Sequence, residues 1–337
     1  MRNLTLLLIL FFTTLFMSAC SQKVTIRALE PASVDRIATT KKISIAPFRN
    51  DRVGLSTKIE ANLAKHSLDD EAYFTIVSRN DFQKIIKEQK IQNSGLIDQD
   101  TVVEVGSLIG AEAIISGNVG RAVSTDTNFY EERIRCGDKK CKQMIVYSVI
   151  CKKRLTSLSA EIRIVDVLYG DIIYADKLKK TKSYKRCSDD SRTIPSTEMT
   201  AQNLASSIAN SFTYKLLPHN RSFRVVLLED PDLDYTDEQE DLLEFSLEYI
   251  EQSRYDKAQK LLFDLIDSTA QQSYVPFYNL GVIKEAEGHY IEAQEYYGVA
   301  DGLMVEPVAE ISNAYLRIQR LIVKRNKAHS QINRGNN

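Results

Sequence analysis

Apolar residues recur with two different periods over the first two thirds of the chain. Alternation in KISIAPF (Lys42–Phe48) and in Thr156–Val167 is typical of strands, whereas the stripe at Leu55, Ile59 and Leu63 is typical of a helix. The strands predicted in this way cover residues 42–48, 74–77, 113–119, 156–167, 171–178 and 223–228. The predicted helices cover residues 55–66 and 201–217, and two more begin at the capping residues Ser78 and Asp100. This alternation indicates an α/β layer with a mixed sheet.

From about Asp237 the pattern is almost entirely helical, and it repeats. Tyr255-Asp256-Lys257-Ala258 aligns with Tyr290-Ile291-Glu292-Ala293 at a spacing of 35 residues, which resembles a tetratricopeptide repeat. An unrelated helical bundle is the alternative. Repeat arrays of this kind bind partner proteins on a concave face, so a protein partner is expected at these helices. The residues at the packing positions of the resemblance are Leu280, Gly281, Gly288, Tyr290, Ala293, Tyr297 and Ala300.

The first 20 residues combine Arg2, an apolar run and the small residues Ser18 and Ala19 before Cys20. This is the anatomy of a secretory signal, and Met-Ser-Ala-Cys resembles a bacterial lipobox. We therefore expect residues 1–19 to be removed and Cys20 to carry a lipid anchor in the outer membrane, with the chain facing the periplasm. A cleavable signal with a coincidental cysteine is the alternative.

The composition is that of a globular protein, with 337 residues, 43% hydrophobic residues and a formal net charge of -1. The length allows two domains, and the charge does not favour nucleic acid as a partner. The expected organisation is a signal peptide over 1–19, a tether over 20–40, an α/β domain over 41–229, an acidic linker over 230–241 and tetratricopeptide-like helices over 242–330.

Motifs that would indicate catalysis are not found in the sequence. It has no P-loop, no G-x-S-x-G, no H-E-x-x-H and no G-x-G-x-x-G, and its four histidines have no partner spacing. Cys136 and Cys141 have a spacing seen at zinc sites, but a second pair that would complete a tetrahedral site is missing. We therefore expect a protein without enzymatic activity, metal or cofactor.

The segment from Phe74 to Val119 resembles the curli-export lipoprotein family (CsgG/HfaB). The residues that carry this resemblance are Phe74, Arg79-Asn80, Glu88-Gln89, Ser94–Asp98, Gly106, Gly110-Ala111-Glu112 and Gly117. Further matches lie at Leu29–Ala32, Ile45–Phe48, Ile162–Asp166 and Gly170–Ile172, so the resemblance extends over about residues 24–229.

The resemblance implies an anticodon-binding-like α/β fold, homo-oligomers and two hairpins inserted at about residues 121–155 and 177–198. In channel-forming relatives these hairpins cross the membrane. Here Gly120–Arg135 has no apolar face, Met144–Cys151 is apolar on both faces like a buried strand, and Lys177–Thr197 carries seven Lys/Arg. Each such charge at mid-bilayer costs about 2–4 kcal/mol, so the residues do not favour a pore.

Four cysteines remain beyond the anchor, and an exported chain favours disulfides. If Tyr169-Gly170 is a two-residue hairpin turn, Cys151 and Cys187 lie one residue out of register, which a single bulge can absorb. Cys136 and Cys141 flank a four-residue turn. Disulfides Cys136–Cys141 and Cys151–Cys187 are therefore predicted, with free buried thiols as the alternative.

The leading hypothesis is an outer-membrane-anchored lipoprotein that acts as a scaffold or accessory component of an envelope or secretion complex. The alternative is a subunit of a secretion channel that exports fibre or polymer components. The stretch from Arg133 to Arg154 has eight Lys/Arg and one acidic residue, so an anionic partner and a solvated face are both compatible with it.

Overall fold

The computed structural model describes residues 21–68, 71–77 and 99–334. The predicted signal peptide and Cys20 lie outside these residues. The predicted helix that begins at Ser78 and the family residues between 79 and 98 lie outside them as well. The chain forms two compact units, and each contains parts that are distant in sequence. One unit consists of the N-terminal segment up to Glu30 together with His219–His329. The other consists of Pro31–Pro218 and the residues from Ser330 on.

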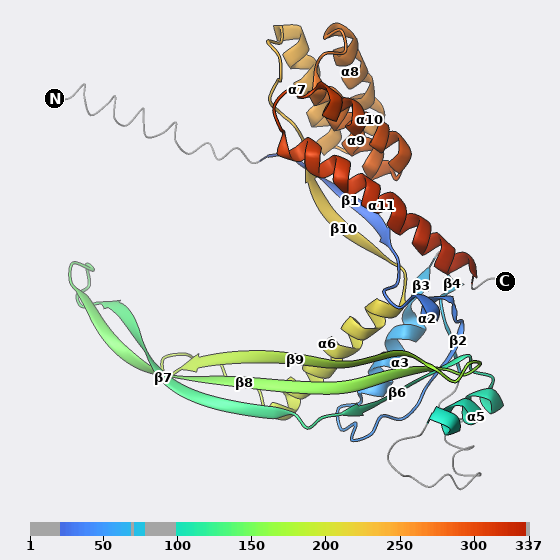
Figure 1. Cartoon of the computed structure of the whole chain (residues 1–337). Helices are drawn as coiled ribbons and strands as arrows, with labels where there is room; N and C mark the ends of the chain where they lie inside the picture. Colours follow the sequence, from blue (N-terminus) through green and yellow to red (C-terminus); the bar gives the residue numbers. More distant parts are fainter. Residues whose placement is uncertain (1–20, 69–70, 78–98, 335–337) are drawn as a thin grey trace. The chain divides into compact units, whose positions relative to one another are not determined.

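The larger unit is a mixed α/β fold, as expected (Figure 1). Its sheet has the order β5-β2-β6-β8-β7, and β9 pairs with β8. β2 is parallel to β5 and β6, whereas β8 is antiparallel to β6, β7 and β9. The strand bounds are β2 Lys42–Ile45, β5 Thr75–Val77, β6 Ala113–Val119, β7 Val123–Cys136, β8 Met144–Asp166 and β9 Ile172–Cys187.

Two helices supply most of the core on one face of this sheet. α3 (Leu55–Lys65) buries Leu55, Ile59 and Leu63, which is the predicted stripe. α6 (Thr197–Leu216) buries a longer stripe, and Ser196 caps it by accepting a hydrogen bond from the backbone N–H of Met199. Ile162 and Ile164 of β8 complete the cluster. The remaining elements of this unit are α2 (Asp35–Thr39), α5 (Gln99–Ile109), β3 (Ser67–Leu68) and β4 (Glu71–Ala72).

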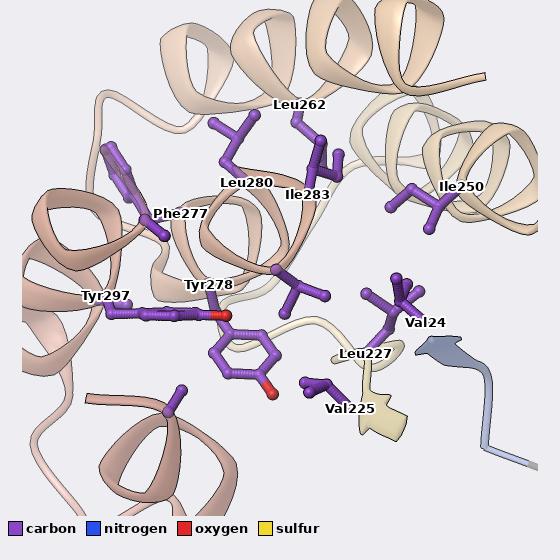
Figure 2. Close-up of a cluster of buried hydrophobic side chains, with 14 of the residues drawn as sticks. Val24, Val225, Leu227, Ile250, Leu262, Phe277, Tyr278, Leu280, Ile283 and Tyr297 are labelled. Carbon is purple, nitrogen blue, oxygen red and sulfur yellow. The ribbon is translucent and has the colours of Figure 1, made fainter. Parts of the chain in front are cut away.

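The smaller unit combines five helices with a two-stranded ribbon. The helices are α7 Asp237–Glu251, α8 Tyr255–Ser268, α9 Tyr274–Glu287, α10 Tyr290–Leu303 and α11 Ala309–Arg334, of which the residues from Ser330 on are counted with the larger unit. The ribbon pairs β1 (Lys23–Glu30) with β10 (His219–Val226) in antiparallel register. Figure 2 shows how Val24, Val225 and Leu227 meet Ile250 and Tyr278 in one apolar cluster.

Several elements differ from those predicted by the sequence pattern. The segment expected to be a tether contains β1 and α2, and α7 begins at Asp237, inside the expected linker. The strand expected at 223–228 is β10, which pairs with β1 and not with the six-stranded sheet. β10 pairs elsewhere because residues 23–30, which are remote in sequence, form a strand of alternating buried and exposed side chains that pairs with it.

The turn between β8 and β9 also differs from the prediction. It is not a two-residue turn at Tyr169-Gly170, because Asp166 and Asp171 are paired and four residues lie between them. The carboxylate of Asp166 accepts hydrogen bonds from the backbone N–H groups of Leu168 and Tyr169, which favours the longer turn. Gly170 has φ +69°, a conformation that favours glycine.

Candidate interaction surface: a disulfide-linked β projection

The most unusual feature of the larger unit is the length of β7, β8 and β9, here called the β projection (Figure 1). β6 and β7 both pair with β8, one after the other, so that β8 runs for 23 residues. Gly120 lies at the junction, where a Cβ atom would approach the Ser159 side chain to 2.8 Å. The two predicted insertions are therefore parts of one continuous strand system.

Opposite faces of β8 are buried at its two ends. Near the core, even-numbered residues from Thr156 to Ile164 are buried, and they pack against the helices. Farther out, the buried residues are Val149 and Cys151, which have odd numbers. Since neighbouring side chains in a strand point to opposite faces, the sheet face that is covered changes between these segments.

The part of the projection beyond β9 is a two-stranded ribbon, the outer hairpin (residues 129–151). It is enclosed by two disulfides, Cys136–Cys141 at its tip and Cys151–Cys187 where β9 ends. Both predicted pairings are confirmed. Cys151 and Cys187 are directly opposed because β8 and β9 have an irregular register between Ile164 and Val165, so the predicted bulge is present.

One face of the outer hairpin carries exposed apolar side chains. In the β7–β8 register Tyr130 is opposite Ile150, and Ile134 is opposite Val146. With Met144 these residues form the apolar stripe, and their exposed fractions range from 49% to 76%. Glu132 and Ser148, a directly opposed pair, share the same face. The expectation that Met144–Cys151 resembles a buried strand is wrong for most of the segment, since Met144, Ile145, Val146 and Ile150 are exposed.

The opposite face carries ion pairs beside a small apolar cluster that includes Val149, Cys151 and Cys187. Glu131 receives a hydrogen bond from Lys185 at 2.9 Å and lies 3.3 Å from Arg133. The bond from Lys185 lowers the pKa of the Glu131 carboxyl. Nearer the core, on the face of the even-numbered residues, Asp126 lies 2.7 Å from both Arg154 and Lys152, and their hydrogen bonds hold its pKa well below the usual value. Lys152 and Lys185 of the two basic segments are thus paired with carboxylates.

A cluster of possible metal ligands also lies on this face. Glu131, Cys151 and Cys187 present oxygen and sulfur atoms within 4.8 Å of one another. The two sulfur atoms are bonded to each other, so they are not thiolates that could hold zinc. The arrangement is therefore a structural crosslink beside a carboxylate.

The residues predicted to pack the helical repeats lie in the smaller unit. Gly281 faces Tyr297, and a Cβ atom there would approach the ring to 2.5 Å. Gly288 follows α9 with φ +82°, which is the left-handed conformation that ends many helices. The other five side chains, those of Leu280, Tyr290, Ala293, Tyr297 and Ala300, are at most 5% exposed.

The helices of this unit already have a partner within the chain. α7 and α9 contact β1, and the inner side of the ribbon is part of the helical core. Tyr278 donates a hydrogen bond to the carbonyl of Val226, and the Asn279 amide exchanges two hydrogen bonds with the backbone of Leu228. The sides of α7 and α9 that face the ribbon are therefore already covered by β1 and β10 of the same chain.

A buried ion pair joins three of the helices. Glu285 of α9 is fully buried, and it accepts hydrogen bonds from Arg317 of α11 and from Tyr297 of α10. Burial alone lowers the pKa of Arg317, but its bonds to Glu285 outweigh this and hold the pKa raised. Such a network specifies the alignment of the three helices.

Sequence analysis did not find the apolar stripe. Its residues come from two segments that were considered separately, and only the cross-strand register places them together. The signal was available in principle, since Tyr130, Ile134, Met144, Val146 and Ile150 all have even numbers on strands joined by a short turn. A separate observation concerns helices that could span a membrane. None of the helices in the described part of the chain has the length and apolar character needed to cross a bilayer.

Comparison with known proteins gives a family match. The model of the family described as curli production assembly/transport component CsgG matches residues 31–205. No curated protein sequence matches the chain.

Three solved structures match about half of this chain. Lipoprotein GNA1162 from Neisseria meningitidis is 16% identical, and the match covers 51% of this chain and 97% of that chain, with a TM-score of 0.27. The hypothetical protein CT253 from Chlamydia trachomatis is 13% identical, and the match covers 52% of this chain and 98% of that chain, with a TM-score of 0.27. A PelC dodecamer from Paraburkholderia phytofirmans is 14% identical, and the match covers 56% of this chain and 95% of that chain, with a TM-score of 0.21.

Proposed function

The chain belongs to the CsgG family, whose model covers more than half of it, and from this premise we propose that it is a lipid-anchored scaffold of an export or envelope complex. In this proposal it faces the periplasm from the outer membrane and performs no catalysis. The observation that carries the proposal is the β projection, because crosslinked strands with exposed apolar side chains suit the binding of another macromolecule.

The compartment and the anchor are supported by separate observations. Disulfides persist in oxidising compartments, and the structure contains two of them. The Met-Ser-Ala-Cys motif supplies the acceptor for lipid at Cys20. Replacing Cys20 by serine is expected to release the chain from the membrane fraction into the soluble periplasm. The anchor would be contradicted if the variant stays in the membrane fraction. It would also be contradicted if the wild-type chain carries no lipid.

The projection can be tested in cells with a photoreactive phenylalanine analogue at Tyr130. This side chain is 76% exposed and lies on the apolar stripe, whereas Leu168 is 79% exposed at the turn between β8 and β9 and serves as the matched control. The scaffold proposal expects a crosslink to a different protein from position 130 and none from position 168. Equal yields from both positions would indicate random collision and would count against the proposal.

A second candidate function is a subunit of an export channel, and the apolar stripe favours it. Exposed apolar side chains on one face and charged residues such as Glu131 and Arg133 on the other are compatible with a strand between lipid and water. Against this, β9 is rich in lysine, and no comparable apolar stripe is found along it. A reproducible large conductance in reconstituted bilayers would favour the channel, and crosslinks from position 130 to lipid would agree with it.

Homo-oligomerisation is part of the proposal. β7 pairs only with β8 among the described strands, so its other edge presents unpaired backbone groups to a second copy. Size-exclusion chromatography with light scattering is expected to give a mass above that of one chain. A monomer at all concentrations, with lipid and detergent present, would remove this part of the proposal.

A protein partner at the helical unit is also proposed, at a different face from the one expected. Because the ribbon covers α7 and α9, the partner is assigned to α8 and α10, where Phe263 and Val299 are 42% and 44% exposed. The rings of Phe263 and Tyr296 are 6.5 Å apart and extend this surface across both helices. The tetratricopeptide identity of these helices stays a prediction. A crosslinker at Phe263, compared with one at Val305, which is 98% exposed, tests the assignment.

A further inference from the structure

The β1–β10 ribbon has a second face, which points away from the helices. Alternation in β1 buries Val24, Ile26 and Ala28 and leaves Lys23, Thr25 and Arg27 exposed. The antiparallel register places Val226, Arg224 and Ser222 opposite these three exposed residues. The outer ribbon face therefore consists of Lys23, Thr25, Arg27, Leu29, Asn220, Ser222, Arg224 and Val226.

This face is positively charged and has no carboxylate. Lys23, Arg27 and Arg224 are all exposed, and none makes an ion pair with a described residue. The nearest acidic groups on the ribbon are engaged elsewhere. Glu30 contacts Lys324 at 2.8 Å and Arg221 at 3.9 Å, and Glu229 accepts a hydrogen bond from the backbone N–H of Gln22. Three cations on this ribbon face are thus left without an ion pair to a described residue.

The position of the ribbon in the chain indicates what neutralises these cations. Lys23 follows Cys20 by only three residues, and an extended chain spans at most about 3.6 Å per residue, or about 11 Å. The start of the ribbon cannot be farther than this from an anchored cysteine. The Debye length at physiological ionic strength is about 8 Å, and the short connection lets the ribbon come within this distance of the membrane surface, where its cations interact with surface charge.

We infer that the outer ribbon face lies on the anionic lipid headgroups of the membrane that holds the anchor. Lys23, Arg27 and Arg224 contact headgroup phosphates, and the hydroxyl groups of Thr25 and Ser222 donate hydrogen bonds beside them. This inference rests on the proposed lipid anchor for its geometry. It adds a surface to a point attachment, so that the helical unit is oriented at the membrane and does not move on a free tether.

Vesicle sedimentation with unlipidated protein tests the surface without the anchor. The chain from residue 20 onward, carrying Cys20→Ser, is mixed with vesicles of phosphatidylethanolamine and phosphatidylglycerol in a ratio of about 3:1, or of phosphatidylcholine alone. Binding is expected only to the anionic vesicles, and it should weaken as salt is added. The combined variant Lys23→Glu, Arg27→Glu and Arg224→Glu is expected to bind at least about tenfold more weakly.

The matched control reverses three exposed lysines at the tip of the outer hairpin: Lys139→Glu, Lys140→Glu and Lys142→Glu. It changes the net charge by the same amount and should retain binding. If the tip variant loses binding and the ribbon variant does not, the contact lies on the projection and the inference is overturned. Equal loss in both would indicate nonspecific charge attraction and would overturn it as well.

Two further outcomes separate the inference from the proposed function. If the wild-type sequence fails to bind anionic vesicles while Cys20 is shown to be lipidated, the ribbon surface is wrong and the anchor stands. If Cys20 carries no lipid but the ribbon variant alone loses binding, the anchor is wrong and the surface stands. Should the charge reversal lower the melting temperature, the glutamine versions of the same three positions are used, with a smaller loss of binding expected.

Discussion

The β1–β10 ribbon and the outer hairpin are both antiparallel pairs of strands, but they are stabilised in different ways. The β1–β10 ribbon buries Val24, Ile26 and Ala28 against helices, whereas the outer hairpin leaves its apolar stripe exposed and has a disulfide at each end. A two-stranded hairpin alone is marginally stable in water. The difference shows that a ribbon is kept in place either by packing or by covalent links, and only the second way leaves its apolar face available for binding.

The largest effect is expected at the buried ion pair of the packed unit. Glu285→Ala leaves Arg317 without its carboxylate in a mostly buried site and should destabilise the helical unit by about 3–5 kcal/mol. The matched change on the projection, Glu131→Ala, removes a partly exposed partner of Lys185 and should have a much smaller effect on stability. Hydrogen exchange with peptide mass spectrometry measures each unit separately, and equal effects would contradict the comparison.

Truncation of an apolar side chain should also destabilise the β1–β10 ribbon more than the outer hairpin. Ile26 is fully buried, so Ile26→Ala is expected to cost about 2–5 kcal/mol, seen as faster exchange in β1, β10 and α9. Ile134 is 64% exposed, and Ile134→Ala should change stability by no more than about 0.5 kcal/mol. A large cost at Ile134 would mean that the stripe is packed against something in the free protein.

Removal of the disulfides should affect the β projection and leave the helical unit unchanged. Cys151 and Cys187 are separated by 36 residues and Cys136 and Cys141 by 5. Chain entropy therefore predicts a loss of about 4 kcal/mol for the first pair and about 2 kcal/mol for the second when each is replaced by serines. Limited proteolysis between residues 123 and 187 is the readout. Equal exchange in the helical unit of both variants is the control, and cleavage there would contradict a local effect.

The smallest effect is expected when the pH is lowered. The pKa values of Asp126 and Glu131 are lowered in the folded protein by their hydrogen bonds to Arg154 and Lys185. These pairs therefore stabilise the projection above the usual carboxyl pKa and lose their contribution as the pH falls through the lowered values. Proteolytic cleavage of the projection by an acid-tolerant protease should be constant from about pH 5 upward and increase below about pH 4. An increase near pH 6 would require another titrating group.

Much of the secondary structure could be predicted from local patterns. The helices α3 and α6 agree with the apolar stripes, β6 agrees with its predicted bounds, and Gly110 ends α5 with φ +67°. The two disulfides were also predictable, because each pair of cysteines lies across a single hairpin. The turn between β8 and β9 was longer than predicted, since the Asp166 side chain accepts hydrogen bonds from two backbone N–H groups inside a four-residue turn.

The sequence by itself determined where helices and strands form, which cysteines meet, the candidate anchor and the family resemblance. All of these depend on residues close in the chain or on motifs in a recognisable order. The tertiary structure decided which face of β8 is covered, which strand pairs with β10, and that the helices hold a ribbon from their own chain. These outcomes depend on contacts such as Ile26 with Phe223, nearly two hundred residues apart, and no local period specifies which distant segment arrives there.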